Sequence, residues 1–182
     1  MQHELVERAQ RGDAGAFETL VHGVADGLYA IAWRILRDPD RAEDALQQAL
    51  IRMWEKLSSL RDPERFDAWA YRLVVHASYR EARRQPRWTP RVREISIDPP
   101  DDDPVGAIID RDELERGFRH LSAEHRAVLV LHYFAGLPVS EVAETLGIPV
   151  GTAGSRLHYA VRSLRAAYEA DARGIVAWRT PA

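Results

Sequence analysis

The sequence predicts an all-α protein made of two small helical domains that are joined by an acidic, proline-rich linker. Three observations support this fold class. Apolar residues recur at helical spacing before residue 86, and no stretch there alternates as a strand would. The helical pattern returns after residue 112, and the segment between the two is rich in proline and charge, which is typical of a linker.

The composition fits a soluble chain that buries a core, with 46% hydrophobic and 29% charged residues among 182. The absence of cysteine excludes disulfides and thiolate metal sites, and the expected location is a reducing cytoplasm. The first residues lack the apolar core of a signal peptide. No run of about 18 apolar residues exists, so no membrane-spanning helix is expected.

Three helices are predicted in the first domain, at 14–36, 39–57 and 66–84. Asp38-Pro39 separates the first two, because proline is tolerated in the first turn of a helix but not in its interior. The predicted core positions are Phe17, Leu20, Val21, Val24, Leu28, Ile31, Ala32 and Ile35, then Ala42, Ala45, Leu46, Ala49, Met53 and Trp54, then Phe66, Trp69, Ala70, Leu73 and Ala77.

The linker carries the negative charge of the chain. Residues 89–112 hold three basic and seven acidic residues, whereas 1–88 hold fourteen of each sign and 113–182 hold eight basic and seven acidic. The net charge of −3 therefore does not describe the surfaces of the two helical domains.

The second domain is predicted to contain a helix-turn-helix motif. Leu114 and Phe118 suggest one helix, and another starts at the N-cap Ser122 and stops at Gly136. The short helix VSEVAETLG follows as the first helix of the motif. The turn IPVG then leads into a last helix, which is predicted to have Thr152 as its N-cap and to end near Ala170. The residues beyond it are expected to form a short mobile tail.

The outer face of the last helix carries no acid, since no Asp or Glu lies between Thr145 and Tyr168. Such a helix fits the major groove of DNA; the alternative is a helical hairpin with a solvated basic face. The pattern predicts a buried stripe of Ala153, Leu157, Ala160, Val161 and Leu164, an outer face of Ser155, His158, Tyr159 and Arg162, and Arg156 on the flank.

Two polar helix faces in the first domain also have alternative interpretations. Asp44, Gln47, Gln48 and Arg52 form one stripe, which either docks a partner or is solvated. The helix at 66–84 is predicted to turn Arg72, Tyr79 and Arg83 outward, with His76 beside them. Cations interleaved with an aromatic ring suit single-stranded DNA. Trp69 is interpreted as a core residue, and the role of Tyr79 is left open.

Two blocks of sequence resemble the extracytoplasmic-function (group 4) sigma factors of RNA polymerase. LSAEHRAVLVLHYFAGLPVSEVAETLGIPVGTAGSRLHYAVRSLR resembles region 4. DPDRAEDALQQALIRMWEKL is similar to region 2.2, and FDAWAYRLVVHASYREARR is similar to the regions that open the promoter −10 element. The blocks cover most of the chain in the family's order, which is more specific than a helix-turn-helix alone.

The resemblance implies a sigma-2 domain at 1–88, a flexible linker at 89–112 and a sigma-4 domain at 113–182. It implies core RNA polymerase and promoter DNA as partners and an anti-sigma factor as inhibitor. Carried onto this chain, the −35 contacts are Thr152, Gly154, Ser155, Arg156, His158, Tyr159 and Arg162, the −10 contacts are Arg72, His76, Tyr79, Arg80 and Arg83, and the polymerase contacts are Asp44, Gln47, Gln48 and Arg52.

The resemblance also gives two connecting segments a role. The loop from Ser58 to Glu64 is where a pocket for a flipped base is expected. The linker is either a solvated tether or an acidic segment that enters the polymerase channel, with Asp101, Asp102 and Asp103 in the place of phosphates. The chain departs from the family's usual residues at Gln48, His76, Arg80, Gly154 and Tyr159, which bears on the promoter sequence that is recognised.

Two other classes of function compete with this interpretation. An ordinary helix-turn-helix regulator would bind DNA without polymerase, but it would need neither of the sigma-2-like helices. An enzyme is not expected, because the chain has no HExxH, phosphate-loop or GxSxG motif and its seven histidines are scattered. No cofactor and no metal site are predicted.

Overall fold

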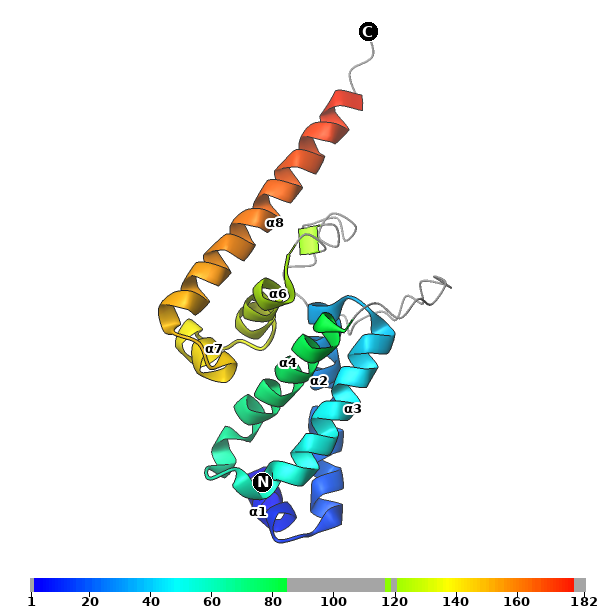
Figure 1. Cartoon of the computed structure of the whole chain (residues 1–182), viewed down its shortest axis with the longest axis vertical. Helices are drawn as coiled ribbons and strands as arrows, with labels where there is room; N and C mark the ends of the chain where they lie inside the picture. The colour runs from blue at the N-terminus through cyan, green and yellow to red at the C-terminus, as the bar shows by residue number, and fades with distance from the viewer. Residues whose placement is uncertain (1, 85–116, 119–120, 179–182) are drawn as a thin grey trace.

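The computed structural model describes residues 2–84, 117–118 and 121–178, with side chains up to residue 166 (Figure 1). All regular structure in these ranges is helical and none is a strand, which confirms the predicted fold class. The predicted linker at 89–112, including Asp101 to Asp103, lies outside the described residues.

The N-terminal part is a bundle of α-helices with a connection of two short 3-10 turns, Leu57–Ser59 and Pro63–Arg65. The helices are α1 (Gln2–Gln10), α2 (Ala14–Leu36), α3 (Pro39–Lys56) and α4 (Phe66–Arg83). The sequence analysis did not predict α1. Only Val6 and Ala9 of α1 are buried, so the helix has too few buried apolar positions for a helical repeat to be recognised in the sequence.

The helix boundaries of the bundle follow from two aspartates and a proline. The carboxylates of Asp13 and Asp38 accept hydrogen bonds from the backbone N–H groups of Ala16 and Arg41, so each caps the start of a helix. Between α2 and α3, Arg37 takes the left-handed conformation with φ of 57°, which ends α2. The predicted break at Asp38-Pro39 is therefore confirmed.

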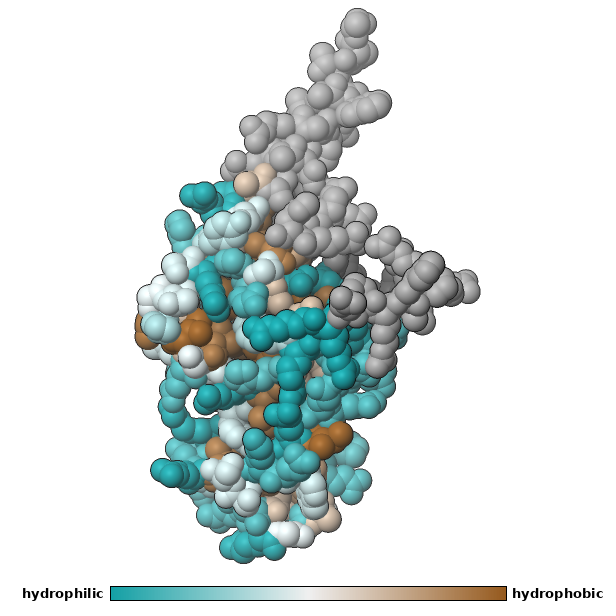
Figure 2. All heavy atoms as spheres, in the orientation of Figure 1, coloured by the Kyte–Doolittle hydropathy of each residue, from teal (hydrophilic) through white to brown (hydrophobic). Residues whose placement is uncertain are grey.

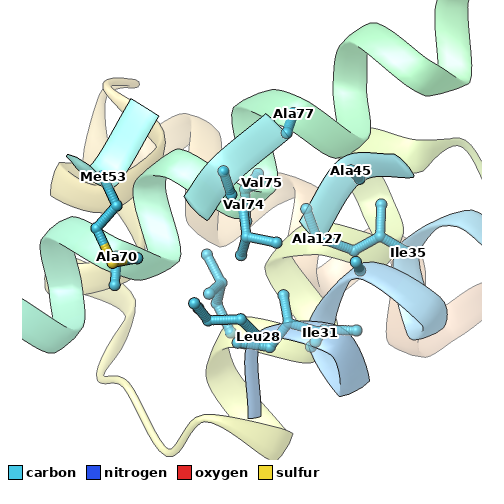
Figure 3. Packing of buried hydrophobic residues seen from close by; sticks show 14 of the residues in the cluster. Leu28, Ile31, Ile35, Ala45, Met53, Ala70, Val74, Val75, Ala77 and Ala127 are labelled. Atoms are coloured by element: carbon cyan, nitrogen blue, oxygen red, sulfur yellow. The ribbon is translucent and has the colours of Figure 1, made fainter. Parts of the chain in front are cut away.

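The core of the bundle lies where α2, α3 and α4 pack together (Figure 3). Most of the predicted core positions are buried or half-buried. Trp54 is the exception: 54% of its surface is exposed. It follows the buried Met53 by one position and so lies about 100° around the helix from it. Its ring meets Phe17 of α2 edge-on, with 4.8 Å between the ring centroids.

The C-terminal part consists of α6 (Ala123–Leu129), a π-helical turn (Val130–Phe134), α7 (Val139–Leu146) and α8 (Val150–Trp178). The predicted cap at Ser122 is confirmed, because its hydroxyl accepts a hydrogen bond from the backbone N–H of His125. The predicted stop is also confirmed: Gly136 has a φ of 71°, a conformation that favours glycine.

Two predictions about α8 are wrong. The helix begins at Val150, so Thr152 lies inside its first turn and is not the N-cap. The carbonyl of Pro149 accepts the first hydrogen bonds, from the backbone N–H groups of Thr152 and Ala153. The helix also continues to Trp178, well past the predicted end at Ala170, so the residues from 171 to 178 are helical.

The two parts pack directly on each other. Helix α6 contacts both α2 and α4, α7 contacts α4, and the π-helical turn contacts α2. The face in Figure 2 is largely hydrophilic over α3 and α4, and an apolar patch lies over the turn between α7 and α8, where Val150 is exposed. Among the described residues, no helix is both long and apolar enough to cross a membrane.

Truncation of the bundle core should cost much more stability than truncation of a surface position. Leu28 of α2 is completely buried, so Leu28→Ala should lower the free energy of unfolding by about 2–5 kcal/mol through lost burial and the cavity left behind. Ile51→Ala is the matched control, because Ile51 is 59% exposed, and it should change that free energy by about 0.5 kcal/mol or less. Urea titration measures both. Equal destabilisation by the two changes would contradict the described core.

Candidate nucleic-acid interface

Helices α7 and α8 form a helix-turn-helix unit with a tight glycine turn. Gly147 has a φ of 66° and its N–H bonds back to the last turn of α7. The N–H of Ile148 donates to the carbonyl of Ala143 at 3.0 Å. The chain then passes through Pro149 into α8, and these bonds fix the angle at which α8 leaves the turn.

A buried stripe holds α8 against the rest of the C-terminal part. Ala153 and Ala160 are 1% and 0% exposed, and Leu157, Val161 and Leu164 pack beside them. Leu121 and Leu129 lie on the other side of this contact. The predicted stripe is therefore confirmed, and the opposite side of α8 faces outward.

The outward side of α8 carries the side chains that the sequence analysis assigned to it. Ser155, His158, Tyr159 and Arg162 are exposed, and Thr152, Gly154 and Arg156 are half-buried at its edges. The ring centroids of Tyr159 and of His125 in α6 lie 4.6 Å apart. This surface offers hydroxyl, imidazole, phenol and guanidinium groups and no carboxylate, which is the chemistry needed to contact base edges and phosphates.

The second predicted surface, on α4, is partly exposed and partly covered. Arg72, His76 and Arg83 are exposed, and Arg80 is half-buried. Tyr79 is half-buried and packs against the core, and its hydroxyl is buried with no hydrogen-bond partner among the described residues. Burial, and then the carboxylate of Glu124, raise the pKa of Tyr79 to about 12.

The exposed part of α4 is a concentration of positive charge around His76. Partial desolvation lowers the pKa of His76, and the neighbouring cations Arg72, Arg80 and Arg52 lower it further. His76 and Tyr79 meet edge-on, with 6.4 Å between the ring centroids. An anionic strand laid on this face would meet arginines and the His76 ring together.

A buried carboxylate, which the sequence analysis missed, ties α3 to α4. Glu81 is 2% exposed and accepts hydrogen bonds from Gln48 Nε2 at 2.5 Å and from Arg84 Nη1 at 2.9 Å. Its backbone carbonyl accepts a bond from Arg41 Nη2. Hydrogen bonds of this kind offset the cost of burying an acidic side chain. No sequence pattern marks Glu81, because it lies among other charged residues.

The predicted polymerase stripe on α3 is therefore not uniformly exposed. Gln47 is exposed and Asp44 and Arg52 are half-buried, while the side chain of Gln48 is bonded to Glu81. Two large apolar residues, Ile51 and Trp54, are 59% and 54% exposed on the same helix. The sequence analysis did not assign Ile51 to any surface. A mixed polar and apolar face of this kind is typical of protein contact surfaces.

The loop from Ser58 to Glu64 is anchored at its base. The side chain of Gln10 donates from Nε2 to the carbonyls of Leu57 and Leu60, at 3.0 and 2.7 Å. Most residues of the loop are exposed, and Asp62 caps the second 3-10 turn. The expected pocket for a flipped base stays a prediction. Among the described residues, no group of three or more His, Asp or Glu side chains is arranged to hold a metal ion.

Two family models match the chain. Residues 20–87 match sigma-70 region 2, and residues 117–166 match sigma-70 region 4. The first match covers α3 and α4 and most of α2, and the second covers α6, α7 and the first half of α8. Both surfaces described above thus fall inside a matched region.

Known proteins agree with these matches. The ECF RNA polymerase sigma factor SigL of Mycobacterium tuberculosis strain H37Rv is 36% identical over 163 residues, which cover 85% of this chain and 92% of SigL. The structure of CnrH in complex with the cytosolic domain of CnrY superposes with a TM-score of 0.66 at 26% identity, over 93% of this chain and 98% of CnrH.

A second solved structure is similar in fold. The sigma factor RpoE in complex with the anti-sigma factor NepR from Bartonella quintana gives a TM-score of 0.64 at 21% identity. The superposition covers 85% of this chain and 98% of RpoE. Its helical architecture is the one described above.

The pKa of His76 should respond to its cationic neighbours. We expect its imidazole to titrate below its ordinary pKa, and Arg72→Ala should raise the pKa because one repelling charge is removed. Arg61→Ala, at an exposed position with no part in the shift, is the matched control. NMR titration of the histidine ring signals measures all three proteins. If Arg72→Ala leaves the pKa of His76 unchanged, the charge of Arg72 does not act on this imidazole.

Proposed function

Because this chain belongs to the extracytoplasmic-function RNA polymerase sigma factors, we propose how its own residues perform promoter-specific initiation of transcription. Residues 1–88 act as a sigma-2 domain that binds core RNA polymerase and opens the −10 element. Residues 113–182 act as a sigma-4 domain that reads the −35 element, and residues 89–112 join the two. The presence of both matched regions in family order carries the proposal.

In the sigma-4 domain, α8 enters the −35 major groove by its N-terminal half. Ser155, His158 and Tyr159 lie toward the bases, and Arg156 and Arg162 lie toward the phosphates. Support comes from the exposure of this side of α8 and from the buried stripe that fixes its opposite side. The space around Gly154 is open on this side of α8, since a β-carbon there would meet nothing within 4 Å.

In the sigma-2 domain, α4 holds the non-template strand of the −10 element. Arg72, Arg80 and Arg83 bind phosphates, while His76 and Tyr79 offer rings for unpaired bases. On α3, Asp44, Gln47 and Arg52 bind the polymerase, with Ile51 and Trp54 at the same surface. Gln48 contributes indirectly by bonding to Glu81 and fixing α3 against α4.

Promoter binding should depend on polymerase. Each DNA surface is small, and a net charge of −3 gives no long-range attraction to DNA. Attachment of both domains to one polymerase raises the effective concentration of the second contact. We expect the chain to act in the cytoplasm without a catalytic reaction or a cofactor, and to be regulated by an anti-sigma factor that covers its polymerase-binding face.

The polymerase contact is tested by pull-down of bacterial core RNA polymerase with the purified chain. We expect stoichiometric binding, and Asp44→Arg should weaken it by about tenfold or more, because a reversed charge on a docking face costs a few kcal/mol. Asp26→Arg is the matched control on an exposed position of α2 and should bind normally. Absence of polymerase binding, together with tight polymerase-free DNA binding, would favour a helix-turn-helix regulator instead.

The DNA contact is tested by transcription from a promoter library with core polymerase. Arg156→Ala should reduce initiation at −35-dependent promoters by about tenfold, the effect of losing one charged contact to a phosphate or base. Arg165→Ala removes the same charge from an exposed position further along α8 and should initiate normally. Full activity of the Arg156→Ala variant would show that Arg156 makes no contact with the promoter that matters for initiation.

A further inference from the structure

The ring of Tyr159 on the outward side of α8 is supported by a side chain from another helix. Tyr159 is 51% exposed, although the next residue, Ala160, is completely buried. The imidazole of His125 in α6 lies beside the phenol, with 4.6 Å between the ring centroids and an angle of 40° between the ring planes. Rings at this separation are in contact. One side of the Tyr159 ring is therefore covered by α6, and the rest is open to the outside.

The imidazole of His125 is itself held in place by the cap of α6. The hydroxyl of Ser122 lies 2.8 Å from His125 Nδ1, within hydrogen-bond distance. The same hydroxyl accepts a hydrogen bond from the backbone N–H of His125 and so caps the helix. Because Ser122 is bound to both the backbone and the ring of His125, the ring is tied to the first turn of α6.

The surroundings of His125 favour its uncharged form. Burial lowers the pKa of His125, and the guanidinium of Arg156 lowers it further, while the carboxylate of Glu124 acts in the opposite direction. The ordinary pKa of histidine already lies below neutral pH, at about 6.5. At neutral pH, His125 therefore offers Tyr159 an uncharged aromatic ring to pack on.

The contact between the two rings is not needed to hold α6 and α8 together. Leu121 and Leu129 already join the two helices through a buried apolar cluster that includes Ala160. The ring pair lies at the edge of this contact, where Tyr159 is exposed. Its effect is to limit the directions that the Tyr159 side chain can take. A side chain that is already restricted loses less freedom when it binds a partner.

The Tyr159 ring brings an apolar surface to a side of α8 that is otherwise rich in polar groups. Ser155 and Arg156 lie one helical turn before it on the same side. Hydroxyl and guanidinium groups suit the polar edges of bases and the phosphates. The C5-methyl group of thymine is an apolar feature of the major groove, and apolar or aromatic side chains contact it. A ring held in a fixed direction matches that methyl group.

We propose that the ring of Tyr159 contacts the C5-methyl group of a thymine in the −35 element, and that His125 is the positioning residue that holds the ring in place for this contact. The inference rests on the proposed function, because the −35 element is the DNA that α8 is proposed to enter. His125 lies outside the −35 residues named in the sequence analysis. The surface that determines base preference is thus built by α6 and α8 together.

The test is transcription by the full chain with core polymerase on promoters in which each −35 thymine, on either strand, is replaced in turn by uracil. Uracil lacks only the methyl group, so replacement at one position should reduce initiation about fourfold, the fold-change expected for one buried methyl group. His125→Ala should shrink this reduction to about twofold or less, and His125→Phe should preserve it because a ring remains beside Tyr159. His22→Ala, at an exposed position of α2, is the matched control and should also preserve it.

Tyr159→Ala is a second variant that does not depend on His125, and it should abolish the uracil effect. A purely structural role of His125 would lower initiation equally on thymine and uracil templates, so an unchanged ratio in His125→Ala would overturn the proposal. Normal initiation by the natural chain with no uracil effect at any position would also overturn it and leave the proposed function intact. No initiation on any template would overturn the proposed function and this inference with it.

Discussion

Helix α4 is packed by two different sets of helices, and this double packing constrains the whole molecule. Its apolar residues Ala70, Val74 and Ala77 are buried in the core that it shares with α2 and α3. Helices α6 and α7 lie against it as well. The same helix carries the arginines and rings proposed for the −10 strand. The residues of α4 that DNA can reach therefore depend on the position of the C-terminal part.

The two sides of α4 hold their charged residues in different surroundings. The carboxylate of Glu81 is bonded to Gln48 and Arg84, and removing both donors would leave a buried carboxylate unpaired. The opposite face keeps its charges in or near solvent, where ion pairs are weak and exchange easily. Helix α4 is therefore tied to α3 on one side, while its other side carries the charges that are proposed to bind DNA.

The sequence predicted the parts of the fold that depend on local rules. Helix periodicity, the Asp38-Pro39 break, the Ser122 cap and the Gly136 stop all act within a few residues, and all are observed. The outer face of α8 was predicted for the same reason. Three features depend instead on which helix packs opposite: the exposure of Trp54, the bond from Gln48 to Glu81 and the burial of Tyr79. Local sequence patterns do not specify which helices pack together.

The most direct test of this account is the distance between the two parts in two states. Ser58 and Ser140 are exposed, and the natural chain has no cysteine, so Ser58→Cys and Ser140→Cys accept a pair of spin labels at defined sites. Pulsed electron paramagnetic resonance should give one short distance in the free chain and a much longer one with core polymerase and promoter DNA. An unchanged distance in the promoter complex would contradict the account.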